Sequence, residues 1–250
     1  MTRFHWSALL TAGLTALAYA LGSLLLFAVA FAGFLSLLGL GVVLPTWRWF
    51  GPYHCHGPRD RRCVALTFDD GPDPATTPAL LELLARHRVE AAFFVVGARA
   101  AAAPELTAAI HEQGHLLGNH SYEHGNLTNF YSTRRLVAEL DRTQQLLQRT
   151  AGSAPRHYRP PIGLSNPNTF AAARALGLTV VGWDVRSLDT QSRDPAAIVA
   201  RIERRLRPGS IVLLHDGGLP APQVCATVEL LLQRLRARDF AIERLDRLLA

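Results

Sequence analysis

The sequence contains no lysine: its 26 basic side chains are all arginine, against 20 Asp and Glu residues. The formal net charge is +6, but no stripe of Arg alternates with aromatic residues, so the sequence gives no support for nucleic-acid binding. Cysteine is scarce too, with only Cys55, Cys63 and Cys225, and none of them forms a CxxC pair. The sequence therefore predicts neither a zinc ribbon nor a thiol redox motif.

Charged residues are also missing from residues 7–44. A helix that crosses a membrane needs about 20 apolar residues, so this stretch is nearly twice as long as one span. The apolar region of a cleaved signal peptide is much shorter. We predict that residues 1–46 form a retained membrane anchor, either one long span or a hairpin of two spans that turns near Gly33.

The arginines that flank this anchor bear on its orientation. Arg3 precedes the apolar stretch, whereas Arg48, Arg59, Arg61 and Arg62 follow it. The positive-inside rule places the side with more Arg in the cytoplasm. A single span with its amino terminus inside would instead place the rest of the chain outside, so the sequence leaves the side open.

Residues 47–62, "WRWFGPYHCHGPRDRR", are rich in aromatic residues, proline and glycine. Aromatic side chains such as Trp47, Trp49, Phe50 and Tyr53 suit the headgroup region of a bilayer, and the Pro and Gly residues argue against regular structure. We predict an interfacial linker here, and we assign the "HCH" at 54–56 to that linker rather than to a metal site.

From residue 63 to residue 250, apolar strand patterns alternate with amphipathic helix patterns. "CVALTF", "AAFFVV", "HLLGN", "LTVVGW", "SIVLLH" and "FAIERL" read as strands, and helical segments lie between them. This alternation predicts an α/β domain with a parallel sheet, and about seven repeats favour a (β/α) barrel over an open doubly wound sheet.

Titratable residues recur where the predicted strands end. They are Asp69, Asp70, His120, His124, Arg159, Asp184, Asp189 and His215. Active residues of parallel α/β folds gather at the carboxyl ends of the strands, so the set predicts one site.

Two histidines and one carboxylate of this set suit a divalent transition metal such as zinc. His120 and His124 lie four residues apart in "HSYEH", so one helical turn would place both imidazoles on one face. Asp70 would complete the ligand set, and Asp69 would remain free as a base. The "HEQGH" at 111–115 matches a zinc-peptidase pattern, but that pattern needs a continuous helix and Gly114 ends the helix here.

Five motifs in order resemble those of the polysaccharide deacetylase family of carbohydrate esterases, which share the NodB homology domain. They are "TFDDGP", "HSYEH", "RPPIG", "SLD" and "LLHD". The resemblance covers most of residues 63–245. It implies a deformed (β/α) barrel, preceded here by the transmembrane segment, and metal-dependent removal of an acyl group from an amino sugar.

The resemblance also implies roles for individual residues. Asp70, His120 and His124 would bind one divalent ion, with zinc expected and cobalt, nickel or manganese as alternatives. Asp69 would be the general base, held by Arg159, and His215 the general acid, oriented by Asp189. The backbone N–H of Ile162 would help to hold the oxyanion.

Two positions depart from the family pattern. Ile162 stands where the family usually has an aromatic residue, and Thr190 stands where Trp usually follows the motif Asp. Both changes remove surface on which a sugar ring could stack. Ser and Asn in "GLSNPN", where apolar residues are expected, also point to an unusual acceptor.

The predicted function is hydrolysis of an N-acyl group, in particular acetyl, from an amino sugar of a glycan or a lipid-linked saccharide. An O-acetyl ester hydrolase and an inactive, membrane-anchored glycan-binding protein are the alternatives. We expect a monomer in a bacterial inner membrane. The family favours an external catalytic domain and the flanking arginines favour a cytoplasmic one.

Overall fold

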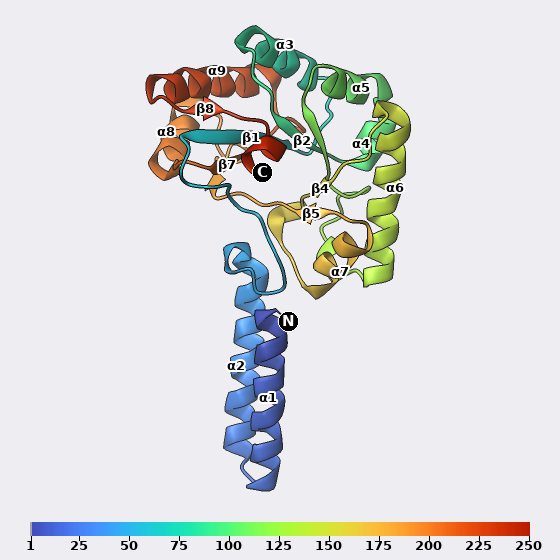
Figure 1. Ribbon diagram of the computed structural model, residues 1–250, viewed down its shortest axis with the longest axis vertical. Coiled ribbons are helices and arrows are strands. Elements are labelled where there is room, and N and C mark those ends of the chain that lie inside the picture. Colours follow the sequence, from blue (N-terminus) through green and yellow to red (C-terminus); the bar gives the residue numbers. More distant parts are fainter. Residues whose placement is uncertain (1) are drawn as a thin grey trace.

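The computed structural model describes residues 2–250 as a helical hairpin joined to an α/β domain (Figure 1). The hairpin consists of α1 (Arg3–Ala20) and α2 (Leu24–Val43), which lie side by side and project from one side of the domain. By length and composition, α2 is the one described helix that could cross a membrane, and almost none of it is buried within the protein. A core helix of a soluble domain would be mostly buried.

The hairpin turns at residues 21–23 and not near Gly33, which lies inside α2. Gly22 adopts a φ of +61°, a left-handed conformation that glycine takes without steric cost. Ser23 then caps α2 by accepting a hydrogen bond from the Leu26 N–H at 3.2 Å. The turn therefore forms at Gly22, which is followed by the cap residue Ser23. Gly33 has no cap residue next to it and does not end the helix.

The domain is built on a parallel sheet with strand order β5-β4-β3-β2-β1-β7-β6, and β8 also pairs with β1. The strands are β1 (Cys63–Asp69), β2 (Ala92–Val95), β3 (Leu116–Asn119), β4 (His157–Tyr158), β5 (Thr179–Val180), β6 (Val185–Arg186), β7 (Ser210–His215) and β8 (Ala241–Ile242). This confirms the predicted deformed barrel. β6, which is only two residues long, is not among the predicted strands.

Helices follow most strands and cover the outside of the sheet (Figure 1). They are α3 (Thr77–His87), α4 (Gly97–Ala102), α5 (Pro104–Glu112), α6 (Thr133–Ala151), α7 (Pro167–Ala175), α8 (Pro195–Arg205), α9 (Ala221–Ala237) and α10 (Leu245–Leu248). Ser132 caps the start of α6 and Gly152 ends it with a φ of +70°. The short α4 was missed because its alanines carry no amphipathic pattern.

Alternation along β1 separates the outer core from the barrel interior. Val64, Leu66 and Phe68 pack in the large cluster with α3 and α9, whereas Cys63 and Ala65 pack in a smaller cluster that includes residues of α10. Successive side chains of a strand point to opposite faces. Asp69 therefore shares the inner face with Cys63 and Ala65, at the carboxyl end of the strand.

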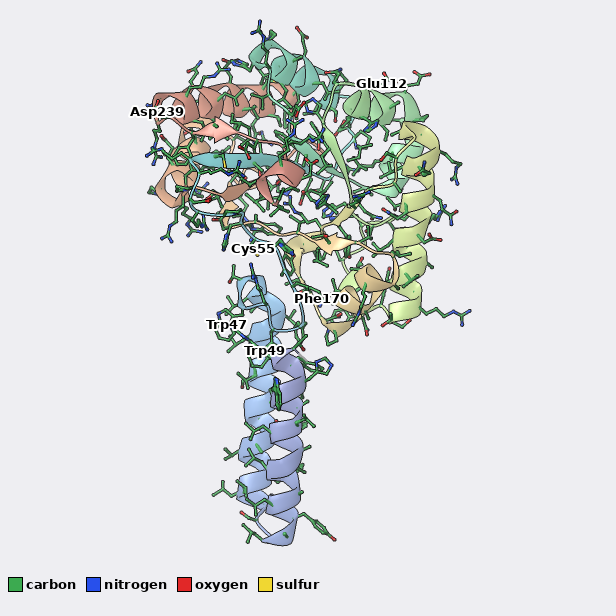
Figure 2. The ribbon with its side chains drawn as sticks, in the orientation of Figure 1. Trp47, Trp49, Cys55, Glu112, Phe170 and Asp239 are labelled. Atoms are coloured by element: carbon green, nitrogen blue, oxygen red, sulfur yellow. The ribbon has the colours of Figure 1, made fainter. Side chains whose placement is uncertain are left out.

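The segment before β1 is part of the barrel, which corrects the interfacial interpretation of Phe50 and Tyr53. Both side chains are buried, at 5% and 1% exposure. His54 forms a parallel bridge with Val181, and its N–H donates to the Val180 carbonyl at 3.0 Å. Cys55 is buried beside this bridge (Figure 2). The chain thus closes the sheet beyond β5, and only Trp47 and Trp49 remain at the hairpin base.

Candidate functional site

Asp69 is held at the end of β1 by a buried arginine. Nη1 of Arg159 donates to Oδ1 of Asp69 at 2.6 Å and to the Thr67 hydroxyl at 2.8 Å, and its Nη2 donates to the Gly182 carbonyl at 2.8 Å. Arg159 is fully buried, and Asp69 is only 3% exposed. A buried charge is tolerated only when it is paired and hydrogen-bonded. This network therefore fixes the carboxylate in one orientation.

Asp70 leaves the strand with a φ of +71°, and its carboxylate lies on the same side as that of Asp69, because each has an oxygen within 3.7 Å of Nε2 of His120. Nη1 of Arg99 donates to the Asp70 carbonyl at 2.6 Å and so braces this turn. The next residue, Gly71, packs against Asp216, where any side chain would clash. The local backbone thus explains why two adjacent carboxylates can serve different purposes.

His120 and His124 lie in the loop after β3, and not on a helix as the spacing predicted. Ser121 and His124 have φ values of +65° and +52°. The Ser121 hydroxyl accepts from the His124 N–H at 3.1 Å, and Oδ1 of Asn119 accepts from the Ser121 N–H at 2.9 Å. These bonds fold the loop back so that the two imidazole rings lie 4.7 Å apart. A tight turn thus achieves what the helical spacing was expected to do.

Asp70, His120 and His124 form the one cluster among residues 2–250 that could hold a metal ion. Oδ1 of Asp70 lies 3.2 Å from Nε2 of His124 and 3.6 Å from Nε2 of His120. Tetrahedral ligands at zinc distances lie about 3.3 Å apart, so the spacing fits such an ion.

The electrostatics of the cluster favour the metal-ready protonation state. Nδ1 of His120 lies 2.7 Å from the Arg159 carbonyl, a partner that keeps the proton on Nδ1 and leaves Nε2 free as a ligand. Burial, together with the neighbouring His120, lowers the pKa of His124. Burial opposes the charged form of Asp70, but hydrogen bonding and the charge of His120 hold its pKa well below the usual range.

His215 ends β7 directly beside Asp69, because the two residues are register partners in the β1–β7 pair. Its Nδ1 lies 2.8 Å from Oδ1 of Asp189, and its backbone N–H donates to Oδ2 of Asp189 at 2.9 Å. Burial lowers the pKa of His215, but the hydrogen bond and charge of Asp189 raise this pKa by a larger amount, so the net shift is upward. The imidazole is therefore cationic over a wider pH range than usual.

Ile162 lies on the loop after β4, in the 3₁₀ turn of residues 161–163, with a φ of +63°. This conformation is rare for a β-branched residue, and strain of this kind often marks a functional site. Gly163 follows with a φ of +77° and packs against the Trp183 ring, where a side chain would clash. The loop thus combines two left-handed residues beside Arg159.

Several residues beyond the predicted set support the site. The Thr67 hydroxyl accepts a hydrogen bond from Arg159, and Ser187 donates to Oδ1 of Asp189 at 2.9 Å. Arg99 donates to the Asp70 carbonyl, and Asn119 accepts from the backbone of the loop that carries His120 and His124. Ser187 lies in the "SLD" motif and Thr67 lies in "TFDDGP", so only their supporting roles were missed. Arg99 and Asn119 carry no signal that singles them out without the fold.

Asp184 is not in the site, although it was grouped with the strand-end residues. It pairs with Arg59 at 2.8 Å and accepts from the Ile211 N–H at 2.9 Å, so it fastens the amino end of β7.

The asparagines of "GLSNPN" have structural partners. Asn166 caps α7 and donates to the Asn129 carbonyl, and Asn168 donates to the Tyr131 carbonyl at 3.0 Å. Both asparagines hold a neighbouring loop by hydrogen bonds, so their polar side chains have a structural role and do not indicate an unusual acceptor.

A cavity of about 630 Å³ lies at the opposite end of the strands. His54, His111, His115 and His157 line it together with Arg156 and Arg244. His111 lies in the last turn of α5, which ends at Glu112, and Nδ1 of His115 accepts from the Ala91 N–H at 3.1 Å. The two histidines of "HEQGH" therefore do not share a helix, and the peptidase interpretation fails.

Comparison with known proteins places these features in a family. Residues 56–181 match the model of the polysaccharide deacetylase family, which is about half of the chain. A chitooligosaccharide deacetylase from Bradyrhizobium sp. is 35% identical over 187 residues, which cover 74% of this chain and 85% of that protein.

Two further proteins that resemble this chain are deacetylases by name. A peptidoglycan-N-acetylglucosamine deacetylase from Bacillus cereus is 36% identical over 66% of this chain and 59% of its own length. The crystal structure of the Bc1960 peptidoglycan N-acetylglucosamine deacetylase superposes with a TM-score of 0.76 and 30% identity, covering 82% of this chain and 95% of that one. The chain therefore belongs to the polysaccharide deacetylase family.

Proposed function

We propose that this protein is a metal-dependent hydrolase that removes the N-acetyl group from an amino sugar at a membrane. The observation that carries the proposal is the pairing of Asp69 with His215 on adjacent strands, beside the cluster of Asp70, His120 and His124. Amide hydrolysis needs a base for the attacking water and an acid for the leaving amine. Family membership and the names of the relatives point to the same reaction.

Asp70, His120 and His124 would hold the ion, and zinc suits this donor set best. When bound, such an ion polarises the amide carbonyl and makes water more acidic. Three protein ligands would leave such an ion with room for a water or a substrate oxygen. A binding module would need no such opening.

Asp69 acts as the general base. Its Oδ1 is occupied by Arg159, but its Oδ2 points toward the cluster and lies 3.7 Å from Nε2 of His120. A water held at the cluster is within reach of this free oxygen. Arg159 holds the carboxylate in place, so Oδ2 of Asp69 would accept the water's proton.

His215 acts as the general acid. Asp189 binds its Nδ1, so Nε2 is directed away from Asp189 toward the site. The raised pKa of His215 keeps a proton available for the amine. The N–H of Ile162 would stabilise the negative charge on the former carbonyl oxygen, and the strained left-handed backbone of this residue supports a functional role.

Acetate release separates this function from its alternatives. We expect the full-length protein in detergent, loaded with zinc, to release acetate from N-acetylated chitotriose and to generate a free amine. Release only from O-acetylated xylan would support an ester hydrolase. Binding of chitotriose without release of acetate would indicate a glycan-binding protein.

The hairpin also bears on the side of the membrane. Both of its ends lie next to the domain, so Arg3 and Arg48 are on the same side, whereas the turn at residues 21–23 carries no charge. By the positive-inside rule, this distribution of arginines supports a cytoplasmic domain. A tag after Ala250 should resist protease in spheroplasts and be cleaved after permeabilisation. Cleavage in intact spheroplasts would place the domain outside.

A further inference from the structure

Three large apolar side chains of the domain are exposed, and all lie on the loops that carry the candidate site. Leu127 is 65% exposed, Phe130 82% and Ile162 51%, and no other large apolar side chain in residues 48–250 is exposed. Single exposed apolar residues are common. It is uncommon, however, that all of them lie on the loops after β3 and β4. We refer to these three residues as the apolar rim.

The two loops of the apolar rim are packed together and braced. Thr128 and Asn129 of one loop line a small crevice with Pro160 and Pro161 of the other. The first loop is also tied by the Thr128 hydroxyl, which donates to the Gly125 carbonyl at 2.6 Å. Leaving a Leu or Phe side chain in water forgoes about 1.5–3 kcal/mol of burial. A braced loop that keeps such side chains exposed indicates a ligand.

Helix α7 connects the apolar rim to the hairpin. Asn166, at its amino end, donates to the Asn129 carbonyl of the rim loop. Ala173 and Arg174, near its other end, line a cavity with Thr2 and Phe50 at the hairpin base. Nine helical residues span about 13 Å, so the rim loop lies only a short helix away from the hairpin. Figure 1 shows α7 on the side of the domain from which the hairpin projects.

The hairpin is also fixed relative to the domain. Nη1 of Arg3 donates to the Trp47 carbonyl at 2.9 Å, and the Phe4 N–H donates to the Trp49 carbonyl at 3.1 Å. Phe50 packs between Phe4 of the hairpin and the cluster that includes Phe170. The hairpin therefore packs directly against the domain, and these contacts define the position of the apolar rim relative to the hairpin.

We infer that the apolar rim binds the hydrocarbon chain of a lipid-linked N-acetylated amino sugar at the membrane surface. The inference rests on the proposed deacetylase function and on the hairpin as a membrane anchor. Two of the three rim side chains are aliphatic, which suits a hydrocarbon chain better than stacking on a sugar ring. A soluble oligosaccharide offers no hydrocarbon chain to these side chains.

A matched pair of substrates tests the inference. One is N-acetylglucosamine joined through a diphosphate to a farnesyl chain, and the other carries a methyl group in place of the chain. With full-length protein in detergent micelles, we expect kcat/KM to be at least about 10-fold higher for the farnesyl compound, since 1.4 kcal/mol corresponds to a factor of ten.

Leu127→Ser combined with Phe130→Ser should abolish this preference while leaving kcat/KM for the methyl compound within about twofold. Trp47→Ser removes apolar surface at the hairpin base instead, and should retain the preference. Equal rates of the wild-type protein on both compounds, or an unchanged preference in the double variant, would overturn the inference and leave the deacetylase function standing. Failure to deacetylate either compound or chitotriose would refute the proposed function itself.

Discussion

Histidines gather at both ends of the sheet, but the two groups have different surroundings. At the carboxyl end, His120, His124 and His215 each have a carboxylate oxygen within 3.7 Å. At the amino end, His115 and His157 are buried, and one ring nitrogen of each has no hydrogen-bond partner. Burial lowers the pKa of His157 and lowers that of His115 to about 4.

The presence of several histidines is therefore not enough to define a catalytic site. A carboxylate partner fixes which nitrogen of an imidazole carries the proton and stabilises its charged form. Without a partner, a buried imidazole is a neutral, largely structural group. Substitutions at the two ends of the sheet should therefore have different consequences.

The largest effect should come from the two adjacent carboxylates at the carboxyl end. Asp70→Ala should lose the metal, because two imidazoles alone hold a divalent ion weakly. Asp69→Asn should keep the metal and lose about 10²–10⁴ in deacetylation rate, because an amide cannot accept the proton of water. Elemental analysis and acetate release on both purified variants check this. If the Asp69→Asn variant were metal-free and the Asp70→Ala variant retained metal, the roles of metal ligand and general base would have to be exchanged.

Truncation should have the next largest effect, through the amino end. A chain that begins at residue 58 lacks the buried Tyr53 and Cys55 and the bridge between His54 and Val181. We expect it to be roughly 3–6 kcal/mol less stable than a chain that begins at residue 48, from two buried side chains and their hydrogen bonds. Urea unfolding of both truncated chains measures the difference. Equal midpoints would show that residues 48–57 do not belong to the barrel.

A smaller effect should follow from removing the carboxylate partner of His215. Asp189→Asn leaves the burial that lowers the pKa of His215 and removes the charge that raises it. The imidazole then loses its proton at lower pH, so the alkaline limb of the kcat/KM profile should move to lower pH. Ser187→Ala, which removes one hydrogen bond to Asp189, should move the limb less. An unmoved limb in Asp189→Asn would exclude His215 as the acid.

The smallest effects should come from the amino-end histidines. His115→Leu leaves the buried Ala91 N–H without its acceptor and should cost about 1–3 kcal/mol of stability. His157→Leu removes a nitrogen that has no partner and should change the free energy of unfolding by about 1 kcal/mol or less. Acetate release should be unchanged for both in calorimetrically folded protein. A large loss of activity in either variant would break the contrast between the two ends.

Three features could be predicted from the sequence: the alternation of strands and helices, the apolar stretch before them and the titratable residues at the strand ends. Each of these depends on local periodicity or on spacing within a motif, which the chain carries residue by residue. The metal cluster could be predicted for the same reason, since Asp70, His120 and His124 lie in two short motifs. Their geometry could not, because a turn with left-handed residues brings the imidazoles together without a helix.

The pairing of residues that lie far apart in the chain could not be predicted from the sequence. Tyr53 lies in a stretch rich in aromatic residues that reads as interfacial, yet it is buried and its hydroxyl donates to the Gly163 carbonyl at 3.3 Å. Asp184 and Asp189 look alike beside a predicted strand, but one fastens β7 and the other orients His215. Such contacts depend on how strands align across the sheet, and strand register is set by packing of the whole core and not by local sequence.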